Sequence, residues 1–228
     1  MNIVFDHVFG LQGAAEVYHS TVSLESVDPV QYDQVLAQGW LADSIGCHPD
    51  WYQCRSTRCA VADTDYTVTV NMQQLHELPV ADMDRIHDRY CQHKNYVKLP
   101  ELEDYLPTDL FFGYRNSAGQ MVAWSKLRPY SRHSVETVFF GWDYAEPKTR
   151  LGINSLTSEI AWAKACGYQY VYLGPGYETM NIYKSKIQGF EWWTGREWSR
   201  DVDQYVALCK RDSAIKRCVD LHDLEIRP

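Results

Sequence analysis

Tyr183 and Lys184 form a short pair of residue types that could act on a reacting group, and Lys186 lies two residues further on. A lysine can hold a phosphate or neutralise an oxyanion, and a tyrosine hydroxyl can donate a hydrogen bond to the same oxygen. The alternative interpretation is a solvated lysine beside a tyrosine of the core.

Two carboxylates stand close to the ends of expected elements. Asp143 follows the strand expected at 134–142, and Glu159 is expected in the first turn of the next helix. Either could hold a cationic side chain or an attacking ammonium group, and Asp143 could also accept the proton of an amine. For Glu159 the helix dipole alone would favour a carboxylate near the helix start.

The residues 138–174 predict the elements that position these groups. Thr137 to Phe140 are β-branched and aromatic, as in a buried strand, and 168–173 alternates as a second strand. Apolar and small residues between them fall on one face of a helix: Leu156, Ile160, Ala163 and Gly167. Asn154 or Ser155 could cap the start of this helix, and Gly167 could close its end.

The order of the expected elements indicates an α+β fold. Antiparallel strands are expected at 110–114, 121–127 and 134–142, before the strand-loop-helix-strand unit, and a further strand at 66–70. A glycine at the helix entrance of such a unit is how a GNAT acyltransferase holds its acyl donor, since backbone N–H groups there favour an anion. We therefore expect a GNAT-like fold with a mixed central sheet flanked by helices.

The rest of the chain predicts three more helices and one more paired strand. The helices are expected at 28–38, 79–91 and 203–221, and an aromatic cluster at 190–198 indicates the strand. The chain divides into a cysteine-containing segment at 1–65, a transfer domain at 66–200 and a helical extension at 201–228.

Three segments in this order resemble the aminoacyl-tRNA–protein transferases, which transfer arginine or leucine in N-degron pathways. They are Tyr32–Gly46 with the cysteine and arginine turn that follows, Val135–Glu159, and Tyr170–Lys184. The chain departs from the family pattern in having no Cys-x-x-Cys pair and in carrying Pro175-Gly176 after its Leu-Gly strand. The resemblance implies transfer of an amino acid, with arginine first and leucine second, from aminoacyl-tRNA to the N-terminal α-amine of a protein.

The resemblance also implies roles for particular residues and no cofactor. Asp143 would orient the amine, while Tyr183, Lys184 and the backbone near Gly152 would stabilise the oxyanion. Residues expected to bind the substrates are Arg58, Glu159, Gly152, Asn154, Ser155 and Lys186, and residues expected to meet tRNA phosphates are Lys126, Arg128, Lys148 and Arg150. Arg58 could read an acidic residue at the acceptor's N-terminus.

The loop before the helix indicates which of two kinds of acyl donor the protein binds. A coenzyme A loop needs Gln or Arg at its first position and Gly or Ala at its last, where this chain has Thr149 and Asn154. Their presence weakens a pyrophosphate cradle and favours the 3′ end of an aminoacyl-tRNA. Three alternatives stay open: transfer from aminoacyl-tRNA to a small amine or amino acid, acetyl transfer from acyl-CoA, and a non-catalytic module that binds N-degrons.

Charge and cysteine content limit the possible partners and the cellular compartment. The 228 residues carry a net charge of −8, which is unfavourable for RNA, although 115–151 contains six basic and three acidic residues. Seven cysteines without a secretory signal or a membrane-length apolar run favour reduced thiols in the cytoplasm and no membrane partner. Cys47, Cys54 and Cys59 are possible metal ligands, but their spacing lacks a tight knuckle, so we expect no metal.

Overall fold

The computed structural model describes residues 2–9, 16–23, 27–43, 50–96, 98, 105–145 and 150–214, and for 2–9 and 16–23 it describes only the backbone. The helices are η1 (Pro29–Gln31), α1 (Tyr32–Ala37), η2 (Val61–Asp63), α2 (Val80–Lys94), α3 (Leu151–Ala165), η3 (Thr179–Lys186) and α4 (Val202–Ala214). The strands are β1 (Asn2–Phe9), β2 (Glu16–Ser23), β3 (Trp40–Asp43), β4 (Asp50–Gln53), β5 (Ser56–Ala60), β6 (Met72–Leu75), β7 (Leu110–Arg115), β8 (Met121–Pro129), β9 (Ser134–Trp142), β10 (Tyr170–Pro175), β11 (Phe190–Trp193) and β12 (Trp198–Ser199).

Eight of the described strands form one mixed sheet in the order β12-β11-β5-β10-β9-β8-β7-β6. β6 to β9 pair antiparallel, β9 and β10 pair parallel, and the strands from β10 to β12 pair antiparallel again. The antiparallel strands, the helix and the parallel strand follow in the predicted order. The predicted fold class, an α+β GNAT-like arrangement with a mixed sheet flanked by helices, is therefore confirmed.

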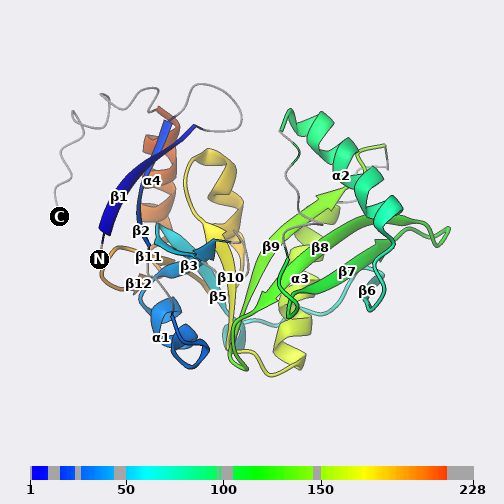
Figure 1. The fold of residues 1–228 in the computed structure, drawn as a ribbon, viewed down its shortest axis with the longest axis horizontal. Coiled ribbons are helices and arrows are strands. Elements are labelled where there is room, and N and C mark those ends of the chain that lie inside the picture. Colours follow the sequence, from blue (N-terminus) through cyan, green and yellow to red (C-terminus); the bar gives the residue numbers. More distant parts are fainter. Residues whose placement is uncertain are drawn as a thin grey trace.

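Helices cover both faces of this sheet (Figure 1). Ala123 and Trp124 are neighbours on β8 and so point to opposite faces. Ala123 belongs to a buried cluster with Leu156 and Ile160 of α3, whereas Trp124 belongs to a cluster with Ile86 of α2. α2 and α3 therefore bury their apolar sides on opposite faces of the sheet, and both helices contact β9.

The first 65 residues contribute a central strand to the sheet. β5 lies between β10 and β11, and its residues 56–59 are buried. β3 and β4 form a separate hairpin, and β2 lies beside β4. A third buried cluster, which includes Leu36, Trp51 and Tyr172, packs this part against the sheet. The segment predicted at 1–65 is therefore interwoven with the expected transfer domain.

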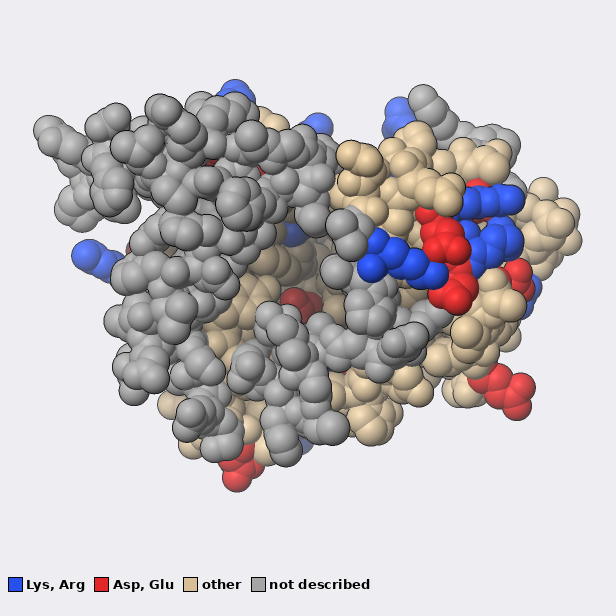
Figure 2. Space-filling model, turned by 45° about the horizontal axis from the view of Figure 1, so that its top comes forward, with Lys and Arg blue, Asp and Glu red and all other residues tan. Residues whose placement is uncertain are grey.

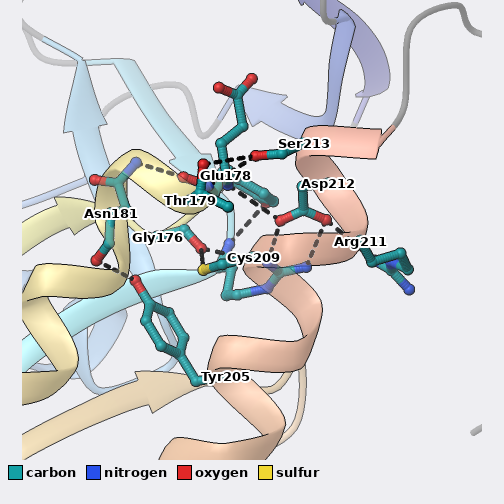
Figure 3. A network of polar contacts seen from close by, with 11 residues as sticks. Gly176, Glu178, Thr179, Asn181, Tyr205, Cys209, Arg211, Asp212 and Ser213 are labelled. Carbon is teal, nitrogen blue, oxygen red and sulfur yellow. Dashed lines mark hydrogen bonds and ion pairs between the residues drawn. The ribbon is translucent and has the colours of Figure 1, made fainter.

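The helix α4 packs onto the same core, although the sequence set 201–228 apart as an extension. Tyr205 and Cys209 are fully buried in the cluster that contains α3. Tyr205 donates to the carbonyl of Asn181 at 3.1 Å, and the Cys209 thiol faces the carbonyl of Gly176 at 3.5 Å (Figure 3). α4 thus holds the segment that joins β10 to η3. The predicted part of this helix beyond residue 214 lies outside the described residues.

Two local predictions need correction. Residues 66–70 form no strand, and β6 lies at 72–75 instead. The reason is tertiary, since the Thr69 N–H donates to the Ser158 hydroxyl of α3 at 3.1 Å and the Tyr66 hydroxyl accepts from the backbone N–H of Gln188 at 2.8 Å. These contacts direct the chain across α3 rather than along a neighbouring strand.

The second correction concerns the start of α3. The helix begins at Leu151, and its N-cap is Arg150 in the left-handed region at φ 57° with no side-chain cap. Ser155 instead donates its hydroxyl to the carbonyl of Gly152 inside the helix at 3.0 Å. The helix end agrees with the prediction, because Gly167 adopts φ 88° directly after the last turn.

We found no helix among the described residues that combines the length and the apolarity needed to span a bilayer.

Candidate functional site

A wedge opens between β9 and β10, the two parallel strands. They pair at three positions, of which Tyr172 with Glu136 is the last. The Thr137 hydroxyl then contacts the carbonyl of Tyr172 at 3.3 Å. Beyond this point β9 continues along β8, whereas β10 turns towards β5 through an irregular register. Figure 1 shows the two strands meeting at one end and diverging towards the other.

Lys184 holds the irregular end of β10. Its ammonium group donates to the carbonyls of Leu173 at 2.6 Å and Pro175 at 2.7 Å, and the side chain is buried. Burial lowers the pKa of Lys184 to about 8. Tyr183 is 45% exposed and Lys186 is exposed, so the predicted pair of Tyr183 and Lys184 does not face one common point.

Glu136 lies at the vertex of the wedge and was not among the predicted site residues. It is buried and accepts a hydrogen bond from the Tyr130 hydroxyl. Burial raises the pKa of Glu136 to about 7, against the opposing effects of Tyr130, Arg128 and Lys184. The charges of Glu136 and Lys184 are thus close enough to interact. The available signal was an acidic residue within the otherwise uncharged strand at 134–142.

Glu159 lies on the opposite face of the sheet, on α3. Because the helix starts at Leu151, Glu159 falls in its third turn rather than in the predicted first turn, where the dipole would favour it. The Tyr114 hydroxyl donates to its carboxylate at 2.5 Å. Burial raises the pKa of Glu159 to about 7. The carboxylate predicted to bind substrate therefore already has a partner inside the core.

Asp143 ends β9, as predicted, but two arginines already occupy it. Its Oδ2 accepts from Arg85 at 2.9 Å and from Arg89 at 2.5 Å, and its Oδ1 accepts from the backbone N–H of Ala145 at 3.0 Å. These contacts leave it poorly placed to accept a proton from an amine. Both arginines were missed by the sequence analysis, although their i, i+4 spacing on the helix expected at 79–91 places them on one face.

These residues belong to a cavity of about 410 Å³ that we call the arginine pocket, and Arg85, Arg89, Arg115, Asp82, Gln120 and Asp143 are among its lining residues. Trp142, the residue before Asp143, lies against the start of α3, because a side chain on Gly152 would lie 3.6 Å from the Trp142 ring. That distance is an ordinary contact, so this position does not need a glycine for steric reasons. Asn154 donates its backbone N–H to the Arg150 carbonyl at 3.1 Å.

The residues predicted to meet tRNA phosphates are mostly buried. Lys126 is fully buried on β8, and Arg128 forms a twofold ion pair with Asp109, both contacts at 2.9 Å. Neither side chain can reach an RNA phosphate from this position, so the prediction is wrong for these two. Both side chains are buried because β8 lies inside the sheet, between β7 and β9. Arg150 is exposed, and Lys148 lies outside the described residues.

Arg58 lies in a second, smaller cavity of about 240 Å³. Its guanidinium is stacked between the rings of Tyr170 and Trp198, with 3.9 Å to each ring centre, and its Nε donates to Glu191 at 2.8 Å. The predicted acceptor-reading arginine is thus already paired with a carboxylate of its own chain.

Two of the three cysteines predicted as weak metal candidates, Cys54 and Cys59, do not converge on one site. Cys54 and Cys59 belong to different buried clusters, and burial raises the pKa of each thiol to about 12. Cys47 lies outside the described residues. Among the described residues, no group of three or more potential ligands is arranged to hold a metal ion.

Comparisons with known proteins give partial structural similarities at low sequence identity. No protein-family model matches the chain, and no curated protein matches it. L-PGS from Bacillus licheniformis is similar over 67% of this chain at 15% identity and a TM-score of 0.41, and the match spans 50% of the L-PGS chain.

Two further solved structures are acetyltransferases. A GNAT family acetyltransferase from Elizabethkingia anophelis with acetyl-CoA bound matches 50% of this chain and 71% of its own, at 16% identity and a TM-score of 0.38. A GCN5-related N-acetyltransferase from Kribbella flavida matches 74% of this chain and 61% of its own, at 13% identity and a TM-score of 0.38. TM-scores below 0.5 identify neither a family nor an activity.

Proposed function

We propose that this protein transfers an acyl group, specifically an amino acid carried by tRNA, to an amine acceptor. The observation that supports this most strongly is the wedge between β9 and β10, with Glu136 at its vertex and Lys184 on its β10 side. In this proposal the extended ester lies between the two parallel strands where they separate, against backbone groups of β9 and β10. The resemblance of three segments to aminoacyl-tRNA–protein transferases supports the choice of donor.

The chemistry is aminolysis of an ester. The nitrogen lone pair of the acceptor attacks the ester carbonyl, a C–N bond forms, and the C–O bond to the ribose breaks. The amine loses one proton in total and the ribose oxygen gains one. Positioning supplies much of the rate in such a reaction, because no covalent intermediate on the protein is required.

Two residues suit the proton and the charge in this reaction. Glu136, with a pKa of about 7, is matched to accept a proton near neutral pH and to return it. Lys184, with a pKa of about 8, is still mainly cationic at pH 7, and the N–H beyond the two bonded to Leu173 and Pro175 would stabilise the tetrahedral oxyanion. In this proposal Glu136 takes the role that the sequence assigned to Asp143, since Asp143 is held by two arginines.

The finer assignment follows the resemblance. Arginine is the first amino acid to test and leucine the second, and the first acceptor is the N-terminal α-amine of a peptide. The acceptor amine must be neutral to attack, and its pKa is roughly 8. A small amine or a free amino acid is the alternative acceptor.

The decisive experiment incubates the purified protein with total tRNA charged with labelled amino acids. One arm adds acceptor peptides, a second adds small amines, and a third replaces charged tRNA with labelled acetyl-CoA. Movement of label from tRNA onto a peptide amine supports the proposal and identifies the amino acid. Label that moves only from acetyl-CoA, or no transfer in any arm, refutes it.

A further inference from the structure

The arginine pocket is a second polar site, which the proposed reaction centre at Glu136 and Lys184 does not use. It is built from α2, the end of β7, the start of β8 and the end of β9. Figure 2 shows basic side chains gathered around acidic ones on one part of the surface. Among its charged residues, three arginines face two aspartates, which gives a local excess of one positive charge in a chain of net charge −8.

Asp143 cannot neutralise both arginines that contact it. Its carboxylate is buried and carries a single negative charge, and both guanidinium groups meet the same oxygen. Arg85 also contacts Asp82 at 3.3 Å, but both side chains are exposed there, and such a surface pair contributes little. One guanidinium charge therefore stays largely uncompensated beside an open cavity.

The geometry orients these guanidinium groups in advance. Arg85 and Arg89 lie one turn apart on α2, and Arg85 also donates to the carbonyl of Met121 at 3.2 Å. Asp143 holds one edge of each guanidinium, and the Nη2 of Arg85 also bonds Asp82 and Met121. The N–H groups left for a ligand on these half-exposed side chains therefore come mainly from Arg89. Planar guanidinium groups with several free N–H donors suit the oxygens of a phosphate.

We propose that the arginine pocket binds a phosphate group of the acyl donor, with Arg85, Arg89 and Arg115 as its ligands and Asp143 as the residue that positions the first two. The pocket lies at the end of β9, seven positions beyond Glu136, and the ring of Trp142, which precedes Asp143, lies against the start of α3. The assignment of the phosphate to the donor rests on the proposed function. Phosphate binding by this pocket can be measured independently of it.

The test measures binding of two probes that contain phosphate, deacylated tRNA and coenzyme A, by titration calorimetry at several salt concentrations. Arg115→Met is the most informative variant, because Arg115 is exposed and bonded to the Gly119 carbonyl rather than to Asp143, so its loss leaves no buried charge unpaired. Arg89→Met removes a ligand that also holds Asp143. The matched control is Arg196→Met, an exposed arginine in the turn between β11 and β12.

We expect each pocket variant to weaken binding of one probe roughly tenfold. For tRNA, the slope of log affinity against log salt should become shallower by about 0.7 to 0.9 for each lost phosphate contact. The control variant should bind like the parent protein. The probe that responds identifies the source of the phosphate, either RNA or a pyrophosphate carrier.

Unchanged binding of both probes in Arg115→Met and Arg89→Met would overturn the proposal, as would an equal loss in Arg196→Met. Arginine-dependent binding in a protein that transfers no label would leave the pocket intact and remove the proposed function. If label is transferred equally well by the pocket variants, the proposed function stands and the pocket has no role in holding the donor.

Discussion

At the scale of single residues, burial raises the pKa of two carboxylates to about 7. Glu136 and Glu159 lie on opposite faces of the same sheet, and each accepts a hydrogen bond from a tyrosine. Removal from water penalises the charged form of a carboxylate more than one tyrosine hydrogen bond favours it. Both groups therefore stay partly protonated at a pH where an exposed glutamate is fully ionised.

Replacing Glu136 with Gln should remove the acidic limb of the pH–rate profile for transfer. In the parent protein we expect activity to rise through pH about 7 as Glu136 loses its proton. The acceptor amine adds its own rise near pH 8, so both proteins are compared with the same acceptor. If Glu136→Gln keeps the limb near pH 7, the base lies elsewhere.

Replacing Glu159 with Gln should flatten the dependence of stability on pH. The carboxyl titrates near 4.5 in the unfolded chain and near 7 in the folded protein. Between these values the folded state binds more protons, so stability falls as the pH rises through this range. The contribution that Glu159→Gln removes is about 3 kcal/mol at most, from a pKa difference of about 2.5.

Urea unfolding at pH 5 and pH 8 measures this difference. The exposed Glu197, replaced by Gln, serves as the control and should keep the parent's pH dependence. An unchanged slope in Glu159→Gln would mean that the carboxylate is ionised throughout the range.

At the scale of elements, the link between η3 and β11 depends on a close approach of two backbone segments. Gly189 adopts φ 70°, and a Cβ there would overlap the carbonyl oxygen of Ala60 at the end of β5. The two segments are also joined by a hydrogen bond, in which the Ala60 N–H donates to the Gly189 carbonyl at 2.8 Å. The order β11-β5-β10 therefore requires a residue without a side chain at this position.

Gly189→Ala should destabilise the protein by about 3 kcal/mol, combining the left-handed backbone with overlap of two backbone atoms. Gly119→Ala is the matched control, because Gly119 adopts φ 79° with nothing within 4 Å of the added Cβ. It should cost only about 1 kcal/mol. Equal losses in the midpoint of urea unfolding would show that the contact with Ala60 is unimportant.

At the scale of the whole molecule, α4 ties together parts of the chain that are far apart in sequence. Arg55 donates to Asp212 at 2.5 Å across 157 positions, and both side chains are mostly buried. Asp212 also accepts from the backbone N–H of Glu178 at 3.4 Å (Figure 3). The irregular end of β10, which borders the wedge, is therefore held from outside by the C-terminal helix.

Asp212→Ala should destabilise the fold by about 3 kcal/mol, since it leaves a buried arginine without its partner. Faster amide exchange in α4 and in the segment after β10 would accompany this loss. Asp203→Ala, an exposed aspartate in the first turn of the same helix, is the control and should cost only about 0.5 kcal/mol. If both variants unfold at the same urea concentration, the ion pair with Arg55 contributes nothing to stability.

Much of the central unit could be predicted because its signals are local. The strand at 134–142 and the glycine that ends α3 follow from alternation and backbone freedom. The strand expected at 66–70 failed because the Thr69 N–H donates to the Ser158 side chain of α3 and the Tyr66 hydroxyl accepts from the backbone N–H of Gln188 in the loop before β11. Local pattern gives no information about such distant partners.

The sequence alone predicted the order of the elements from 110 to 174 and the position of Asp143 directly after β9, since both depend on residues close in the chain. Only the tertiary structure decided which charges are free to act. Asp143 is occupied by Arg85 and Arg89 from more than 50 positions away, and Glu136 acquires its shifted pKa from burial. Desolvation and ion pairing depend on what surrounds a group in space, and that surrounding exists only after the sheet has formed.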